Sequence, residues 1–417
     1  MGFRFVHAAD LHLDTPFRGL GAASPELAER LRDASLDALD RVVAKALDVD
    51  AAFVVFAGDL YDGVERGPRA QLRFLRALER LSRAGIPSFV AHGNHDPEGG
   101  AWTAIRAWPD GVTVFAPGEP QSVPVVKGGA RLATVHGVSY GKRAERENLA
   151  LRFPVRRGGD GLHVAVLHAN VDGAVEHEPY SPCSLADLTS RGMGYWALGH
   201  VHRHRVLAEG PTWVVYPGNT QGRSFGAGEL GAKGAVVVDV EGGAVTRVTP
   251  FATDSARFCE LEADVGALAD IAELSTHLGD AASALRDAHG DGVTLLVRAR
   301  LGGRGDLYHD LRRPGVVAAV LGDLRAEAPH DVAWLALVDE TRPGLDLAAI
   351  RGAHDLRADV VALWDDWARG GLDGLPDALR AELELVGGLP DAAELGTLLD
   401  AAAYDVLDRL TPDTEVA

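Results

Sequence analysis

The short polar segment Gly93-Asn94-His95-Asp96 directly follows an apolar run at residues 87–91. Such a run is typical of a buried strand, and open α/β sheets bind their ligands in the loops at the carboxyl ends of strands. Four other polar motifs also follow apolar, β-branched or aromatic runs. They are Asp10-Leu11-His12, Gly58-Asp59, His168 and Gly199-His200-Val201-His202. We therefore expect an α/β (α+β) fold in which five strand ends bring Asp, Asn and His side chains to one edge.

The chain has 417 residues, more than one hydrophobic core usually holds, because single cores stop growing at about 250–300 residues. Strands and helices alternate at the start and strands dominate up to about residue 253, which favours two facing sheets with outer helices. A new strand and helix pattern begins near residue 256, and residues 340–344 form a plausible linker. We expect a sandwich domain at residues 1–253, a small α+β capping domain at 254–343 and a helical segment at 344–417.

The net charge of −19 is unevenly distributed. Residues 1–253 carry 28 acidic and 27 basic side chains, whereas residues 254–417 carry 32 and 14. The near-neutral first part can meet phosphates, and the acidic last part would repel them. The longest early apolar run, residues 51–57, is far shorter than the roughly 18 residues of a membrane span, and a signal-peptide core is lacking. We expect a cytoplasmic protein with no membrane partner.

Two stretches have the periodicity of amphipathic helices. Residues 68–84 place four leucines on one expected face: Leu72, Leu75, Leu78 and Leu81. We expect these leucines to cover a sheet and the interleaved arginines to face solvent. The C-terminal segment carries two apolar stripes, Leu356, Val360, Leu363, Trp364 and Trp367, then Leu395, Leu398, Leu399, Ala402, Val406 and Leu410. Asp391 and Glu394 predict a capping box at the start of the second stripe. The two stripes pack either on each other or on a partner.

The motif loops carry nitrogen and oxygen ligands for metal ions. They are Asp10, His12, Asp59, Asn94, His168, His200 and His202. Seven ligands exceed what one ion accepts but suit two ions that share a carboxylate. His200 and His202 alternate on extended backbone about 6–7 Å apart, so each ring can serve a different ion. A mixed set without thiolate favours Mn²⁺, Fe or Mg²⁺, with Zn²⁺ also compatible. Two such ions suit in-line displacement at phosphorus.

The order of these motifs resembles that of the calcineurin-like metallophosphoesterases over residues 4–220. The resemblance implies a four-layer αββα sandwich and a two-metal centre. It assigns Asp10, His12 and His202 to the first metal, Asn94, His168 and His200 to the second, and Asp59 to the bridge. It also implies that His95 faces the leaving oxygen or the phosphoryl group as acid or stabiliser, while Asp96 supports the loop.

Longer motifs resemble the SbcD-like DNA repair exonucleases, in particular their YhaO-type branch. These motifs are Asp10-Leu-His-Leu-Asp-Thr-Pro-Phe17, Tyr180-Ser-Pro-Cys183, Tyr195-Trp-Ala-Leu-Gly-His-Val-His202 and Tyr216-Pro-Gly-Asn-Thr-Gln-Gly-Arg223. The sequence departs from the branch at two places. Asp62 stands where some relatives carry a second active-site histidine, and residues 224–230 are less basic than the continuation expected after Arg223.

The resemblance implies a Mn-dependent DNA exonuclease or endonuclease in which a bridging hydroxide attacks phosphorus in line and His95 assists. Arg223 is expected to contact the substrate. Expected partners are DNA and a coiled-coil ATPase of the SbcC or YhaN type on the C-terminal helices, with a homodimer as a further option. One alternative is a phosphodiesterase or phosphatase for a small molecule or nucleotide at the same site. The other, a scaffold with a decayed site, is disfavoured by the intact ligand set.

Overall fold

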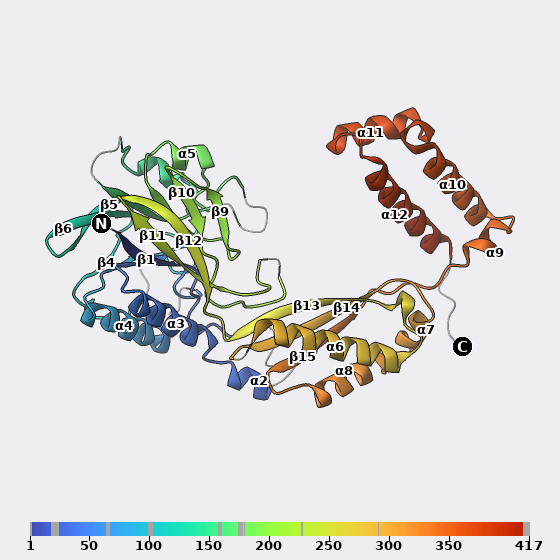
Figure 1. Ribbon diagram of the computed structural model, residues 1–417, viewed down its shortest axis with the longest axis horizontal. Helices are drawn as coiled ribbons and strands as arrows, with labels where there is room; N and C mark the ends of the chain where they lie inside the picture. The colour runs from blue at the N-terminus through green and yellow to red at the C-terminus, as the bar shows by residue number, and fades with distance from the viewer. Residues whose placement is uncertain are drawn as a thin grey trace. The chain divides into compact units, whose positions relative to one another are not determined.

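The computed structural model describes residues 2–17, 25–63, 67–98, 103–156, 161–173, 178, 180–226, 228–290 and 292–411. The chain divides into two compact units (Figure 1). The first comprises Met1–Leu261, Ala281–Arg298 and Glu327–Ala336, and the second comprises Glu262–Asp280, Ala299–Ala326 and Leu337–Ala417. The expected division into three domains stays a prediction.

The first sheet of the first unit has the strand order β12-β11-β1-β2-β3-β4. Its strands are β1 (Phe3–Ala8), β2 (Val54–Ala57), β3 (Ser88–Ala91), β4 (Val112–Val114), β11 (Gly234–Glu241) and β12 (Ala244–Ala252). Strands β1 to β4 are parallel, whereas β11 runs antiparallel to both of its neighbours. The carboxyl ends of β1, β2 and β3 therefore meet at one edge.

The second sheet has the order β5-β6-β7-β8-β10-β9. Its strands are β5 (Gln121–Lys127), β6 (Ala130–Gly137), β7 (Leu162–His168), β8 (Tyr195–Gly199), β9 (Arg205–Ala208) and β10 (Trp213–Tyr216). Strands β6, β7, β8 and β10 are parallel, and β5 and β9 form antiparallel edges. The ends of β7 and β8 lie side by side, because His168 pairs with Gly199.

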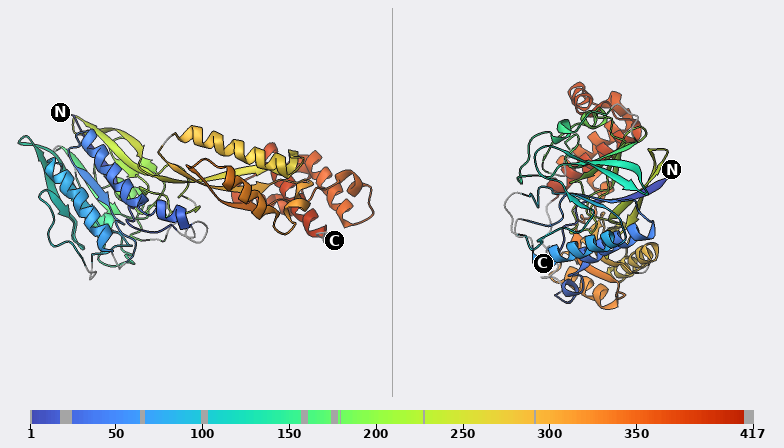
Figure 2. Two further views of the ribbon diagram at one scale, coloured as in Figure 1. Left: turned by 90° about the horizontal axis from the view of Figure 1, so that it is seen from below. Right: turned by 90° about the vertical axis from the view of Figure 1, so that its left-hand side faces the viewer.

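The two sheets pack face to face around an aromatic and β-branched core. The rings of Phe5 on β1 and Tyr195 on β8 meet edge to face with centroids 5.2 Å apart. Helices α3 (Ala34–Asp48) and α4 (Pro68–Arg83) cover the outer face of the first sheet, and Figure 2 shows these blue helices side by side. The short helices η1 (Leu149–Arg152) and α5 (Leu185–Thr189) cover the second sheet. This four-layer arrangement confirms the expected fold class.

Helix α4 covers the sheet with a face that overlaps the predicted one only in part. Its buried residues are Ala70, Gln71, Phe74, Ala77, Leu78 and Leu81, whereas Leu72 is exposed. The prediction is confirmed for Leu78 and Leu81 and wrong for Leu72, because a helix turns about 100° per residue and residues three apart drift around its axis, which places Leu72 opposite Leu81. The arginines face outward as expected, and several are ion-paired: Arg73 and Arg80 both bind Asp40 of α3.

The remaining elements begin with a three-stranded sheet of order β13-β14-β15. Its strands are β13 (Ala256–Asp264), β14 (Thr294–Gly302) and β15 (Val332–Asp339), with the connecting elements η2 (Val265–Ala267), α6 (Ile271–His289), α7 (Leu307–Leu311) and α8 (Val316–Glu327). Helix α2 (Pro25–Arg30) contributes Leu27 to an apolar cluster with Ala256, Phe258 and Leu296 of the first unit. No helix among the described residues is long and apolar enough to cross a membrane.

The C-terminal helices form a hairpin within the second unit. They are α9 (Leu347–Arg351), α10 (Leu356–Gly374), α11 (Asp377–Gly387) and α12 (Ala392–Leu410), with a kink in α10 at Gly371. The capping box of Asp391 and Glu394 is confirmed. The predicted stripe of α12 is partly wrong. The buried positions are Leu395, Leu399, Ala403 and Leu407, which recur every four residues, whereas Leu398 and Val406 are 49% and 41% exposed. Helix α12 packs along α10, where Trp364 meets Tyr404.

Candidate active site

The five predicted loops meet in the first unit. The loops that follow β1 and β2 are hydrogen bonded, since Asp10 N donates to Gly58 O over 3.0 Å and His12 N donates to Asp59 O over 3.0 Å. Four of the residues in these loops have positive φ angles: Asp10 (52°), His12 (42°), Asp59 (50°) and His200 (107°). Such angles are uncommon outside glycine, and strained backbone of this kind clusters at functional sites.

Two glycines allow the loops to approach one another. A Cβ atom on Gly93 would lie 2.3 Å from Asp59 Oδ1, and a Cβ atom on Gly199 would lie 1.8 Å from Ala57 O. No real side chain tolerates such contacts, so any larger residue at these positions would push the loops apart. The glycines of the Gly-Asn-His-Asp and Gly-His-Val-His motifs are thus required by packing next to the candidate ligands.

Asp10, His12 and His202 form the first candidate metal group, because their ligand atoms all lie within 4.8 Å of one another. The Nε2 atoms of His12 and His202 face each other at 3.2 Å. Burial, followed by the charges of Arg223 and His202, holds the pKa of His12 well below its usual value. His12 is therefore favoured in the neutral form that a metal ligand needs, and His12 Nδ1 has no hydrogen-bond partner among the described residues.

Asp10, Asp59 and His168 form the second group. His168 Nδ1 donates to Ala57 O over 3.0 Å, which turns Nε2 toward Asn94 Oδ1 at 3.0 Å and Asp59 Oδ2 at 3.4 Å. Burial opposes protonation of His168, but Asp59 outweighs it and raises the pKa to about 9. The surroundings of Nε2 thus attract positive charge, as a cation site does.

The two groups share carboxylates. Asp10 belongs to both, and Asp59 Oδ2 lies 4.0 Å from His12 Nε2 as well as 3.4 Å from His168 Nε2. Asp10 and Asp59 are therefore the carboxylates that lie close to ligand atoms of both groups. His200 lies beside the second group, with its ring centroid 5.2 Å from that of His168, but its Nε2 atom points to Glu178 O at 2.9 Å. His200 belongs to neither group among the described residues.

His95 lies at the rim of the site and is 30% exposed. Its Nδ1 atom donates to Asp62 Oδ1 over 2.6 Å, and its ring centroid is 5.1 Å from that of His12. Burial lowers the pKa of His95, but the hydrogen bond to Asp62 and the charges of Asp59 and Asp62 produce a net increase. The protonated imidazole is consequently favoured.

Asp62 is a functional candidate that sequence reasoning noted only as a departure. Its second oxygen forms a salt bridge with Arg223, so this carboxylate joins His95 to the arginine expected at the substrate. The hydrogen bond from His95 lowers the pKa of Asp62, and this effect is larger than the increase caused by burial. The sequence did carry a signal, because an ionised carboxylate three residues after Asp59 offers two acceptor oxygens and a negative charge, which a histidine does not.

Asp96 is fully buried and turned toward its own loop. Its Oδ1 atom accepts from Gly93 N over 2.8 Å, and its Oδ2 atom accepts from Leu60 N over 2.9 Å. His92 Nδ1 also lies 3.0 Å from Oδ2. Asp96 thus ties the loop after β3 to the loop after β2, and the same carboxylate orients the ring of His92.

A second missed residue is Glu229, which lies in the segment noted for its low basicity. Glu229 Oε1 is 2.5 Å from His202 Nδ1. Burial raises the pKa of Glu229, but the hydrogen bond and the charge of His202 outweigh it and lower the pKa to about 2.

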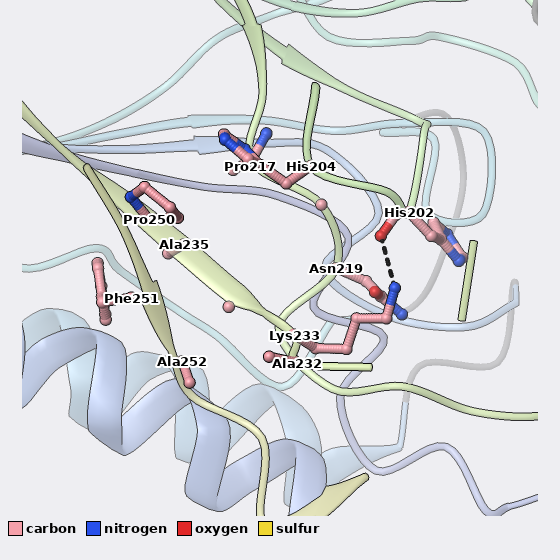
Figure 3. Close-up of a pocket in the computed structure, with 12 residues that line it drawn as sticks. His202, His204, Pro217, Asn219, Ala232, Lys233, Ala235, Pro250, Phe251 and Ala252 are labelled. Atoms are coloured by element: carbon pink, nitrogen blue, oxygen red, sulfur yellow. Dashed lines mark hydrogen bonds between the residues drawn. The ribbon is translucent and has the colours of Figure 1, made fainter. Parts of the chain in front are cut away.

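Nearby, a cavity of about 210 Å³ is lined by His202, His204, Asn219 and Lys233 among others (Figure 3). Lys233 Nζ donates to His202 O over 3.1 Å.

The other strand histidines belong to the core. His7 lies between the sheets, with Nδ1 3.0 Å from the Tyr195 hydroxyl and Nε2 3.1 Å from Leu198 O. Burial lowers the pKa of His7 to about 3, which makes it a neutral hydrogen-bonding group. His163 is buried against His136, with a nitrogen separation of 2.8 Å.

Comparison with known proteins adds an independent observation. Residues 3–204 match the family model described as calcineurin-like phosphoesterase. The chain is 40% identical over 243 residues to the uncharacterized metallophosphoesterase YhaO of Bacillus subtilis, covering 58% of each chain. It is 30% identical over 227 residues to the DNA double-strand break repair protein Mre11 of Aeropyrum pernix, covering 52% of this chain and 53% of that one. It is also 25% identical over 272 residues to one component of the SbcCD nuclease of Bacillus subtilis, covering 58% and 67%. The chain thus spans little more than half the length of the first two relatives.

Proposed function

Because residues 3–204 form a calcineurin-like phosphoesterase domain, we propose that the chain is a two-metal phosphodiesterase that cleaves DNA. Members of this family are hydrolases that act on phosphoesters. The family match over residues 3–204 confirms the resemblance to calcineurin-like metallophosphoesterases seen in the sequence. The observation that carries the proposal is the convergence of two Asp and His groups that share Asp10, with Asp59 of the second group also close to His12 of the first. Such a pair of adjoining cation sites is the device by which proteins hydrolyse phosphodiesters.

The donors present fit two divalent ions. Asp10, His12 and His202 would hold the first ion, Asn94 and His168 the second, and Asp59 would bridge them. His200, assigned to the second ion by the resemblance, would have to exchange its contact with Glu178 O for that ion. The facing Nε2 atoms of His12 and His202 support this assignment, since two lone pairs at 3.2 Å need a proton or a cation between them. Oxygen and imidazole ligands without thiolate favour Mn²⁺, with Fe, Mg²⁺ or Zn²⁺ as alternatives. Bound ions of this kind lower the pKa of water and neutralise phosphoryl oxygens.

The chain's own residues would complete the reaction. Asp62 accepts a hydrogen bond from Nδ1–H of His95, which leaves Nε2–H of His95 to donate a proton to the leaving oxygen or to stabilise the phosphoryl group. Arg223 is held by Asp62 and is suited to a phosphate oxygen of the substrate. Asp96 would act by holding the loop of His95, and not by contact with the substrate.

DNA is the substrate best supported by the relatives, which are named as a DNA double-strand break repair protein and a nuclease component. The proposal includes a coiled-coil ATPase partner on the C-terminal helices, in a cytoplasmic DNA repair complex that could contain two copies of the chain. Within the helical hairpin, Leu385, Leu389 and Leu398 are 85%, 47% and 49% exposed, and a cavity of about 550 Å³ is lined by Leu389 and Leu398. This apolar surface suits a protein partner better than DNA.

The proposal is tested by incubating metal-stripped protein with Mn²⁺, Mg²⁺ or Zn²⁺. The substrates are labelled duplex DNA, single-stranded DNA and bis-p-nitrophenyl phosphate. We expect metal-dependent cleavage of DNA and of the small diester. Cleavage of the small diester alone would replace DNA by a small-molecule substrate, and no cleavage with any ion would contradict the enzyme assignment.

A further inference from the structure

We infer that Glu229 is a positioning residue that fixes the orientation of His202, a candidate metal ligand, and the backbone of Arg223, a candidate substrate contact. The inference rests on the proposed function, because it assigns His202 to a metal ion and Arg223 to the substrate. It concerns a part of the chain, residues 219–233, that the phosphoesterase family match does not reach.

The carboxylate of Glu229 is surrounded by donors. Oε1 lies 2.5 Å from His202 Nδ1, and Oε2 accepts from Asn219 Nδ2 and from Arg223 N, both over 2.9 Å. Glu229 is only 9% exposed, so these contacts are largely shielded from water. An ionised carboxylate accepts and never donates, so it fixes the His202 proton on Nδ1. The lone pair of His202 is thereby directed through Nε2, the atom that faces His12.

The main chain around His202 is held by Lys233. Lys233 is 5% exposed, and its ammonium donates to His202 O over 3.1 Å (Figure 3). The same ammonium also donates to Gly228 O. Gly228 immediately precedes Glu229, so one ammonium joins the backbone of the histidine to the backbone of the carboxylate that orients it. Asn219 N donates to the same His202 O over 3.2 Å. The imidazole and the backbone of His202 are therefore both restrained from one segment.

The other oxygen of Glu229 connects this segment to His95. Oε2 fixes the backbone of Arg223, the guanidinium of Arg223 binds one oxygen of Asp62, and the other oxygen of Asp62 accepts from His95 Nδ1 over 2.6 Å. A Cβ atom on Gly222 would lie 2.7 Å from Glu229 O, so the backbones of Gly222 and Glu229 lie close together. A connected series of contacts thus runs from His202 through Glu229, Arg223 and Asp62 to His95. Glu229 contacts His202 through one oxygen and Arg223 through the other.

Glutamine cannot reproduce these contacts although it has nearly the same size. Its amide has one oxygen and one NH₂ group, whereas the site presents donors to both oxygens of Glu229. In Glu229→Gln, the single amide oxygen keeps the two donors Asn219 Nδ2 and Arg223 N, so the NH₂ group faces the Nδ1–H of His202. The branch to His202 is therefore the one that is broken.

The test compares Glu229→Gln with Asp254→Asn in the full chain. Asp254 is a matched control, because it is 1% exposed and binds Arg257 through two 2.8 Å contacts without touching the candidate ligands. Mn²⁺ binding is measured by titration calorimetry and by electron paramagnetic resonance, which distinguishes coupled pairs from single ions. We expect Glu229→Gln to bind one of two Mn²⁺ ions about 10- to 100-fold more weakly, as is typical when an orienting partner of a ligand is lost. Asp254→Asn should keep both ions.

Four outcomes would contradict the inference or the function on which it rests. Binding of two ions by Glu229→Gln at wild-type affinity would overturn the inference, as would an equal loss in Asp254→Asn. If Glu229→Gln fails to fold by circular dichroism, the same titration is made on Glu229→Asp, which keeps the charge but is shorter by one methylene. That variant should also lose one ion, and retention of both would overturn the inference. A wild-type protein that binds no metal would instead contradict the proposed function.

Discussion

Replacing Asp62 by asparagine removes a negative charge while leaving the side chain nearly the same size. Asp62 binds His95 over 2.6 Å and forms a salt bridge with Arg223, and it is 23% exposed. A hydrogen bond to a charged group contributes roughly 1 kcal/mol more than a neutral one. Two such bonds therefore lose about 2 kcal/mol, which corresponds to about a 30-fold decrease in kcat if both groups act in the transition state.

The pH dependence of kcat gives this prediction a direction. Burial lowers the pKa of His95, but the hydrogen bond and charge of Asp62, together with Asp59, outweigh it. His95 therefore stays protonated to a higher pH than an ordinary histidine. In Asp62→Asn the pKa of His95 should fall, so the loss of kcat with increasing pH should begin at a lower pH than in the wild type.

The assay measures kcat against pH for bis-p-nitrophenyl phosphate and for DNA, with bound Mn²⁺ counted in each sample. The control is Asp40→Asn, because Asp40 also binds two cations, Arg73 and Arg80, but on the outer helices. We expect the control to match the wild type and Asp62→Asn to retain its ions. An unchanged kcat and pH profile in Asp62→Asn would refute the role assigned to the Asp62 and His95 pair.

Three further predictions follow from the site and the hairpin. Asp59→Ala should lose more bound metal than His12→Ala, because Asp59 lies near both candidate groups, and elemental analysis of dialysed protein decides this; two ions retained per chain would contradict the bridge. His95→Ala should keep its metal while kcat falls by about 10²–10⁴-fold, with a smaller fall on substrates that have good leaving groups; loss of metal would make His95 a ligand instead. The double variant Leu385→Glu and Leu398→Glu should hydrolyse bis-p-nitrophenyl phosphate normally but fail to co-purify with the proposed ATPase, whereas retained co-purification would exclude this surface.

The convergence of the motif loops was predictable because it depends on topology alone. Parallel neighbouring strands end at the same edge, so apolar runs followed by Asp, Asn or His bring those side chains together wherever the strands pair. Asp10, Asp59 and His168 accordingly lie within one group. The error in helix α4 had a local cause. The prediction placed leucines three residues apart on one face. Because three residues turn a helix by about 300°, successive leucines move around the axis, and Leu72 is exposed while Leu81 is buried.

The partners of the site histidines were not predictable in the same way. Glu229 lies 27 residues from His202, and Arg223 lies 161 residues from Asp62, with the contacts set by how the segment after β10 folds back. Neither the period of a helix nor that of a strand carries such information. In the sequence, Asp62 and the segment that contains Glu229 stand out only as departures from the resemblance. In the folded chain, Asp62 is hydrogen bonded to His95 and Glu229 to His202.

The left-handed backbone at Asp10, His12, Asp59 and His200 has a consequence for protein engineering. Each residue of this kind costs of order 1–3 kcal/mol that the rest of the fold must supply. Glycine would remove the strain at any of the four positions and remove the functional side chain with it. A selection for thermal stability alone should therefore enrich glycine there and yield robust but inactive proteins, whereas a selection for turnover should keep the strained residues and accumulate stabilising changes elsewhere.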